Sequence, residues 1–163
     1  TRELKKVRAF IRKRRNKGKF EALFLQHFEK MIRLATRAAE QLETSGYETL
    51  YEQSICGKRL VHGDYNYHNV LMPRKVMEKH PWDVKFGDAM LEMYSRIRPL
   101  SQAEIEYISL KLIYPEKFWK VANAYYQSNK AWIPEKSVEK LETAIRQTEE
   151  KMRFVEQIFA FHL

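Results

Sequence analysis

Residues 62–69 hold a His, an Asp and an Asn at a spacing that could support phosphoryl transfer. The motif reads H-G-D-x-x-x-x-N, with the apolar runs Leu-Val before it and Val-Leu-Met after it. A positioned carboxylate can orient an acceptor hydroxyl and take its proton, which is the role we predict for Asp64. A carboxamide oxygen can ligate a magnesium ion that bridges ATP phosphates, which is the role we predict for Asn69. His62 would support the loop from beneath.

Besides the kinase-like interpretation, this motif could be a polar loop without a catalytic role or a zinc site. The kinase catalytic loop, H-R-D-x-x-x-x-N, has the same spacing from Asp to Asn. An H-G-D triplet alone occurs by chance, and the segment would then be a polar loop between two short strands. The Asn at the matching distance and the apolar flanks favour the kinase-like interpretation. A zinc site at His62 and His68 is disfavoured, because no third ligand with a familiar spacing lies near them.

The elements that must position this loop are mainly helical, since the chain has only five Gly and five Pro. Apolar residues recur every three or four positions in seven segments. Helices are therefore predicted over 2–15, 20–42, 74–79, 88–97, 102–113, 116–126 and 136–162. Residues 47–56 are ambiguous and could form a short helix. The motif's flanks predict a short β-hairpin. The expected fold class is mainly α with a short β-hairpin, in one domain over 1–163.

Some of these segments also suit other structures. The apolar seam of 136–162 fits a coiled coil or a helix face packed on the core, and we favour the core. Residues 114–132 are rich in aromatic side chains and lysines, which could stack on bases or sugars. The helical spacing of Phe118, Ala122 and Tyr125 favours core packing instead. Gly46 suits the end of the second helix and Ser101 suits the start of another.

Composition limits the class of protein. Apolar residues make up 44% and aromatic residues 13%, as in globular chains. No apolar run approaches the roughly 20 residues of a membrane span, and no signal-peptide pattern follows the basic start. Cys56 is the single cysteine, so an intrachain disulfide is excluded and a reducing, cytoplasmic location is favoured. Because the first residue is Thr1 rather than Met, we expect a fragment or a processed chain.

The motif and its flanks resemble the catalytic loop of the aminoglycoside phosphotransferase and choline kinase superfamily, whose fold is similar to that of protein kinases. More narrowly, the chain resembles the CotS-like spore-coat branch of that superfamily. This narrower resemblance covers nearly the whole chain. Besides the motif, it rests on Lys5-Lys6-Val7-Arg8, Phe10-Ile11-Arg12, Glu78-Lys79-His80-Pro81-Trp82-Asp83, Tyr114-Pro115-Glu116-Lys117-Phe118-Trp119-Lys120 and Asn129-Lys130-Ala131-Trp132.

The resemblance implies the C-terminal lobe of a kinase-like phosphotransferase associated with the spore coat. Such an enzyme would use ATP and magnesium to phosphorylate a small-molecule hydroxyl. The alternative is a catalytically silent structural or scaffold component of the coat, so enzymatic activity stays open. The implied partners are a small-molecule acceptor or spore-coat proteins, with no membrane and with nucleic acid unfavoured. The implied location is the cytoplasm, or the coat after assembly.

The resemblance also indicates parts that this chain lacks. There is no G-x-G-x-x-G, so the N-terminal nucleotide lobe is absent. Relatives carry a metal-binding Asp at the end of a strand that follows the catalytic loop. Here the helical pattern begins directly after Met72, so we expect a missing segment near 72–74. Asp88 is a candidate for that ligand, but we favour Asp88 as a helix N-cap. Asp83 is a weaker candidate.

The net charge of +9 is confined to the start of the chain. Residues 1–19 contain ten Lys and Arg and one acid, whereas the remaining residues carry equal numbers of each. This excludes a uniformly basic nucleic-acid coat. Leu4, Val7 and Ile11 form an apolar stripe at helical spacing, so we expect a docked helix with a basic outer face. That face would serve solvation, an anionic substrate or a coat partner, with nucleic acid last.

Overall fold

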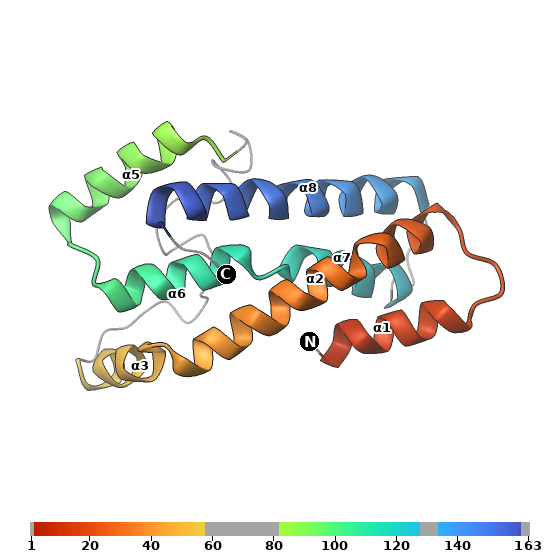
Figure 1. Ribbon diagram of the computed structural model, residues 1–163, viewed down its shortest axis with the longest axis horizontal. Coiled ribbons are helices and arrows are strands. Elements are labelled where there is room, and N and C mark those ends of the chain that lie inside the picture. Colours follow the sequence, from red (N-terminus) through yellow and green to blue (C-terminus); the bar gives the residue numbers. More distant parts are fainter. Residues whose placement is uncertain (1, 58–81, 128–133, 161–163) are drawn as a thin grey trace.

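The computed structural model describes residues 2–57, 82–127 and 134–160, and nearly all of them are helical (Figure 1). These ranges contain no strand, which confirms the mainly helical prediction for them. The predicted β-hairpin, the predicted helix over 74–79 and the expected gap near 72–74 all lie outside the described residues. The helices are α1 (Arg2–Lys13), α2 (Lys19–Thr44), α3 (Tyr47–Cys56), α5 (Val84–Ile97), α6 (Gln102–Ile113), α7 (Glu116–Gln127) and α8 (Pro134–Phe159).

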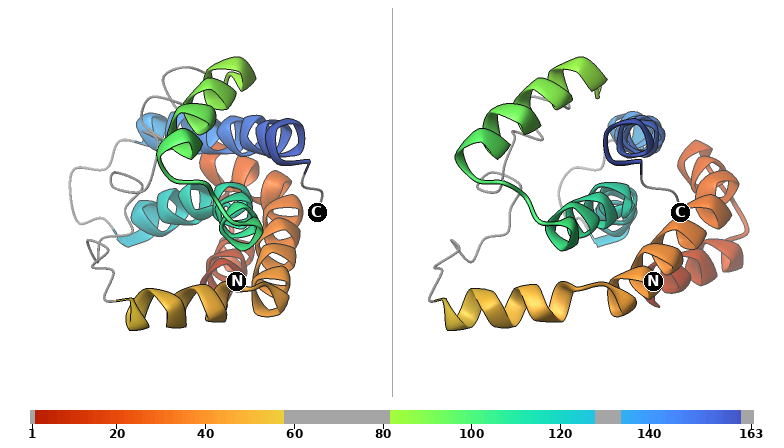
Figure 2. Two further views of the ribbon diagram at one scale, coloured as in Figure 1. Left: turned by 90° about the vertical axis from the view of Figure 1, so that its left-hand side faces the viewer. Right: turned by 60° about the vertical axis from the view of Figure 1, so that its left-hand side comes forward.

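The long helix α8 is the element around which the others pack. It contacts α2, α5, α6 and α7, while α1 lies against α2 and α7, and α3 lies against α6. Figures 1 and 2 show α3 and α5 at the end of the bundle away from α1, on opposite sides of α6. None of the helices in the described ranges is long and apolar enough to cross a membrane.

Two apolar clusters fill the bundle, and the seam of α8 runs through both. The first cluster joins α1, α2 and α7 to α8 residues such as Leu141. The second joins α6 to the C-terminal half of α8, including Phe154 and Val155. Met152 packs against both clusters. The predicted core packing of α8 is therefore confirmed, as is that of α7, whose Phe118 is fully buried.

The basic N-terminal segment is a docked helix, as its apolar stripe predicts. Leu4 and Ile11 are 2% and 0% exposed, and Val7 packs beside them. Lys5 and Arg12 lie exposed on the same helix. Because the apolar stripe anchors α1 to the first cluster, its basic side chains are held on a fixed surface rather than on a free arm.

Two of the predicted caps are wrong, for local reasons. Helix α5 begins at Val84, and its N-cap is Asp83, whose Oδ1 accepts a hydrogen bond from the Phe86 N–H at 2.8 Å. Asp88 therefore lies inside the helix and does not cap it. At the end of α2, the C-cap is Ser45 rather than Gly46. Helix α3 begins directly afterwards, and Gly46 serves as its N-cap.

The predicted start of α6 is confirmed. The Ser101 hydroxyl accepts a hydrogen bond from the Glu104 N–H at 3.2 Å, and the Glu104 carboxylate accepts one from the Ser101 N–H at 2.9 Å. This reciprocal capping box satisfies two backbone donors that would otherwise lack partners at a helix start. It fixes the path of the chain between α5 and α6.

Candidate functional site

The predicted catalytic residues His62, Asp64 and Asn69 lie outside the described residues. The structure does describe the two helices on either side of that segment in the sequence, α3 before it and α5 after it. Each of these helices is held on the bundle by a small number of specific contacts. Those contacts fix the positions of these two helices on the bundle.

Helix α3 is held against α6 by aromatic stacking. The Tyr47 ring stacks on Tyr107 of α6 with ring centroids 5.0 Å apart, and on Tyr51 at 6.3 Å. Gly46 lies close to Ala103, so this end of α3 sits near the start of α6. No residue of α3 is buried, however. The helix is therefore attached at its N-terminal turn, and Tyr51 and Ile55 farther along it are exposed.

The chain re-enters the described structure at Trp82, which is buried. Its ring meets Phe154 of α8 edge to face, with centroids 5.4 Å apart. The Lys151 ammonium lies 5.2 Å from the centroid of the indole ring, which is a cation–π distance. Trp82 thus anchors the start of α5 to α8. No role is predicted for Trp82 from the sequence alone. A hydrophobic residue directly before a helix N-cap nevertheless often fixes the angle at which the chain enters the helix.

Gly87 lets α5 lie directly on α8. It is the buried residue of α5, and a Cβ placed on it would overlap the edge of the Phe154 ring. Any larger residue would push the two helices apart or displace the ring. Glycine at this position therefore reflects a close approach of two helices rather than a helix end.

Asp88, the candidate second metal ligand, is exposed on α5. In the described ranges, no group of three or more His, Cys, Asp or Glu side chains lies close enough to hold a metal ion. Among the described residues, Asp88 is therefore not part of such a group. Its position relative to Asn69 lies outside the described residues, so its metal role stays a prediction.

A buried acid joins the α1–α2 turn to α7. Glu21 is 3% exposed, and its Oε1 accepts hydrogen bonds from Arg14 Nη1 at 3.1 Å and from the Tyr126 hydroxyl at 3.2 Å. Its Oε2 accepts the Gly18 N–H at 3.0 Å. Burial, and then the negative charge of Glu21, raises the pKa of Tyr126 above its ordinary value. This network is not predicted from the sequence. The one local signal of the network is the G-x-x-E spacing at the start of α2.

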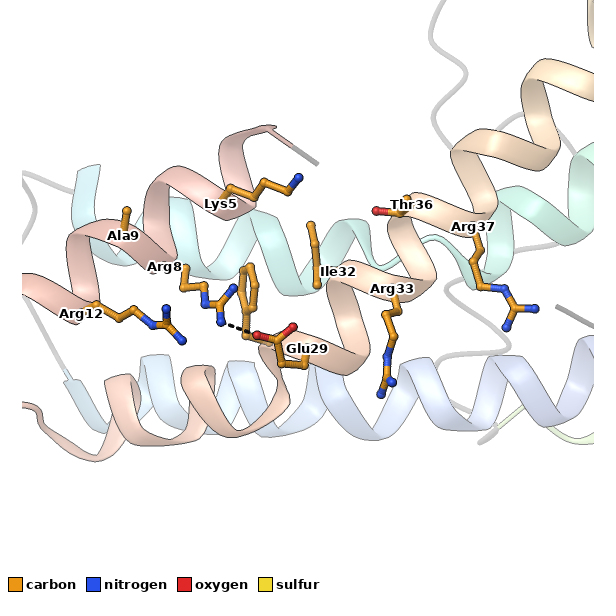
Figure 3. A pocket seen from close by; sticks show the side chains of 10 residues that line it. Lys5, Arg8, Ala9, Arg12, Glu29, Ile32, Arg33, Thr36 and Arg37 are labelled. Atoms are coloured by element: carbon orange, nitrogen blue, oxygen red, sulfur yellow. Dashed lines mark ion pairs between the residues drawn. The ribbon is translucent and has the colours of Figure 1, made fainter.

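Two grooves lie beside α1 and the turn between α1 and α2. One, of about 600 Å³, is lined by Glu21 and Tyr125 together with residues of α8. The other, of about 570 Å³, lies between α1 and α2 and is rich in basic side chains (Figure 3). The described residues that line the two grooves belong to α1, α2, α7, α8 and the turn between α1 and α2, whereas the predicted catalytic motif lies outside the described residues.

Comparison with known proteins places the chain among spore coat proteins. Residues 71–158 match the family model described as "Spore coat putative kinase YutH". The match starts just after the H-G-D-x-x-x-x-N motif, so it rests on α5 to α8 and the residues before them. The spore coat protein S of Bacillus subtilis (strain 168) is 25% identical over 171 residues, covering 85% of this chain and 47% of that protein. The chain thus spans about half the length of this relative.

No solved structure matches the chain. The family model, however, covers more than half of the residues, including most of those that surround α8. On this basis the chain belongs to the family described as "Spore coat putative kinase YutH".

Proposed function

We propose that this chain is the helical, C-terminal part of a kinase-like spore coat protein that transfers the γ-phosphoryl group of ATP to a small-molecule hydroxyl. The observation that carries the proposal is the H-G-D-x-x-x-x-N motif at 62–69, directly before the residues that match the "Spore coat putative kinase YutH" family. The similarity to a spore coat protein supports the coat location.

Each residue of the motif has a defined task in this proposal. The acceptor hydroxyl gives its proton to the Asp64 carboxylate while its oxygen bonds to the γ-phosphorus. The bond from that phosphorus to the bridging oxygen of ADP breaks in the same transfer. Asn69 would hold the magnesium ion that accompanies ATP, and His62 would support the loop. Magnesium, when bound, would neutralise part of the negative charge of the ATP phosphates.

The described helices support this proposal by the way they bracket the motif. Tyr47 attaches α3 to α6, and Trp82 attaches the start of α5 to α8. Because α6 and α8 pack on each other, both attachments are made to one helical unit. The helices before and after the motif in the sequence are thus attached to the same unit, and phosphoryl transfer demands that a protein position its catalytic groups.

The test is Asp64→Asn in the complete natural protein, assayed for ATP turnover with magnesium. The amide keeps the shape of the side chain but cannot accept the proton, so we expect turnover to fall by about 100-fold or more. The matched control is Glu92→Gln, which removes one exposed carboxylate of α5 that pairs with Arg96. Turnover that survives Asp64→Asn would contradict the proposal.

A second candidate function is a structural role in the coat without catalysis. The observation that favours it is a set of exposed apolar side chains at helical spacing. Met93 and Ile97 on α5 are 69% and 89% exposed, and Tyr51 and Ile55 form a similar pair on α3. Such side chains suit contacts with neighbouring proteins in an assembly. Absence of magnesium-ATP binding to the wild-type protein, with coat assembly kept by Asp64→Asn, would favour this function.

A further inference from the structure

The groove between α1 and α2 concentrates positive charge on one face of the molecule. Five basic side chains and one acidic side chain line it, and Figure 3 shows them projecting from the two helices. The basic residues are Lys5, Arg8 and Arg12 of α1, with Arg33 and Arg37 of α2. Because residues 1–19 carry a net charge equal to that of the whole chain, this groove beside α1 lies at the positive end of the protein's charge distribution.

One of the five basic side chains already has an anionic partner. Arg8 forms an ion pair with Glu29, and its guanidinium lies 4.5 Å from the centroid of the Phe28 ring. The other four make no side-chain hydrogen bond or ion pair with any residue in the described ranges. They are exposed and carry the same charge, so they repel one another. An anionic ligand in the groove would relieve that repulsion.

The floor of the groove is apolar. It is formed by Ala9, Phe28 and Ile32, of which Phe28 and Ile32 are 1% and 8% exposed. The guanidinium of Arg8 covers the Phe28 ring. Ala9 is exposed and Ile32 slightly so, and the groove therefore offers a small apolar contact for an aliphatic side chain but no free aromatic face on which a nucleic-acid base could stack.

The dimensions of the groove suit a few residues of extended chain. Lys5 and Arg12 are seven residues apart, or about 10 Å along the axis of α1. An extended peptide spans that length with about three residues. Alternate residues of such a peptide lie about 7 Å apart, close to the axial separation of about 6 Å between Arg33 and Arg37 on α2.

We propose that this groove binds an acidic segment of a partner protein, in which carboxylates alternate with aliphatic residues. The aliphatic side chains would lie on Ala9 and Ile32, and the carboxylates would meet the four unpaired cations at the rim. A small phosphate compound fits less well, because the groove is open and its basic side chains are exposed. This role does not rest on the proposed phosphoryl transfer, since it is argued from residues of α1 and α2 alone.

The test is fluorescence anisotropy with a labelled peptide of alternating glutamate and valine, titrated with the 163-residue chain. The informative variant is Arg33→Glu with Arg37→Glu, which reverses two unpaired charges of the groove. Each position loses an attraction and gains a repulsion, so we expect affinity for the peptide to fall by about tenfold or more. Circular dichroism of the variant should match the wild type, because both residues are exposed.

The matched control is Lys136→Glu with Lys140→Glu. These lysines are also exposed and also four residues apart on a 26-residue helix, and their replacement gives the same change of net charge. If the groove is the binding site, this control should keep wild-type affinity within about twofold. An equal loss in both double variants would show attraction to net charge alone and would overturn the proposal.

Two further probes test the class of ligand. Single-stranded oligothymidylate and inorganic phosphate are titrated as competitors of the labelled peptide. We expect neither to displace it at concentrations where unlabelled peptide does. The proposal would be overturned if the oligonucleotide bound more tightly than the peptide, or if phosphate displaced the peptide at those concentrations. It would also be overturned if the peptide did not bind.

Discussion

The two ends of this helical bundle are stabilised in different ways. At the end formed by α1, α2 and α7, aromatic rings stack in the core. The ring centroids of Phe24 and Phe118 are 5.0 Å apart, and those of Phe20 and Tyr125 are 3.8 Å apart. At the other end, α3 has no buried residue, and α5 is attached through Trp82 and Gly87. The end that borders the candidate catalytic segment is therefore held by fewer buried contacts. We expect it to open locally without unfolding of the rest.

The first prediction tests the aromatic core with the largest expected effect. Phe118→Ala should lower the free energy of unfolding by about 4 kcal/mol, because Phe118 is fully buried and stacked on Phe24. Urea denaturation measures the change, and amide exchange should accelerate throughout the bundle. The control Ile97→Ala, at an 89% exposed position, should change stability by less than about 0.5 kcal/mol. If Phe118→Ala and Ile97→Ala lowered the free energy of unfolding by similar amounts, the two ends of the bundle would not differ in stability as described.

The second prediction concerns the close contact of α5 with α8. Gly87→Ala should destabilise α5 by about 1–2 kcal/mol, since displacing the Phe154 ring costs more than alanine gains in helix propensity. Hydrogen exchange should accelerate in α5 and stay unchanged in α1. The double variant Gly87→Ala with Phe154→Leu should recover part of the loss, because the smaller side chain makes room for the methyl group. A more stable α5 in Gly87→Ala would contradict the close approach.

The smallest expected effect is a pH dependence at the basic end. Burial and the charge of Glu21 raise the pKa of Tyr126, and the pKa of Tyr125 is raised in the same direction. The unfolded chain therefore loses these protons first, so the stabilisation is present below about pH 10 and is lost as the pH rises above it. Urea denaturation between neutral and alkaline pH should show this decline, and Tyr126→Phe should reduce it. Tyr51→Phe, at an exposed position, should leave it unchanged.

The helices were predictable where a local signal and the apolar spacing agree. The bounds 102–113 match α6 because Ser101 and Glu104 form a capping box that depends on neighbouring residues alone. The docking of α1 was predictable from the apolar stripe that contains Leu4 and Ile11. In each case, the information that decides the structure lies within one helix.

The errors arise where distant contacts decide the structure. Asp88 precedes the good helix formers Ala89, Met90 and Leu91, whereas α5 begins before them, where Trp82 and Gly87 pack on Phe154. Glu21 reads as an ordinary exposed acid until Tyr126, 105 residues later, closes over it. The catalytic motif is predicted from residue types and spacing alone, and it stays a prediction. A metal role of Asp88 also stays a prediction, because a metal ligand is defined by its position in space rather than by a motif.

The position of α8 in both apolar clusters has a consequence for protein synthesis. Residues 134–159 leave the ribosome after every other described helix, yet they complete the core at both ends of the bundle. Until then, Phe24 and Phe118 at one end and Trp82 at the other lack the helix that covers them. The core at both ends of the bundle therefore cannot close before α8 has emerged, and nascent chains that stall before α8 would expose apolar surface to chaperones.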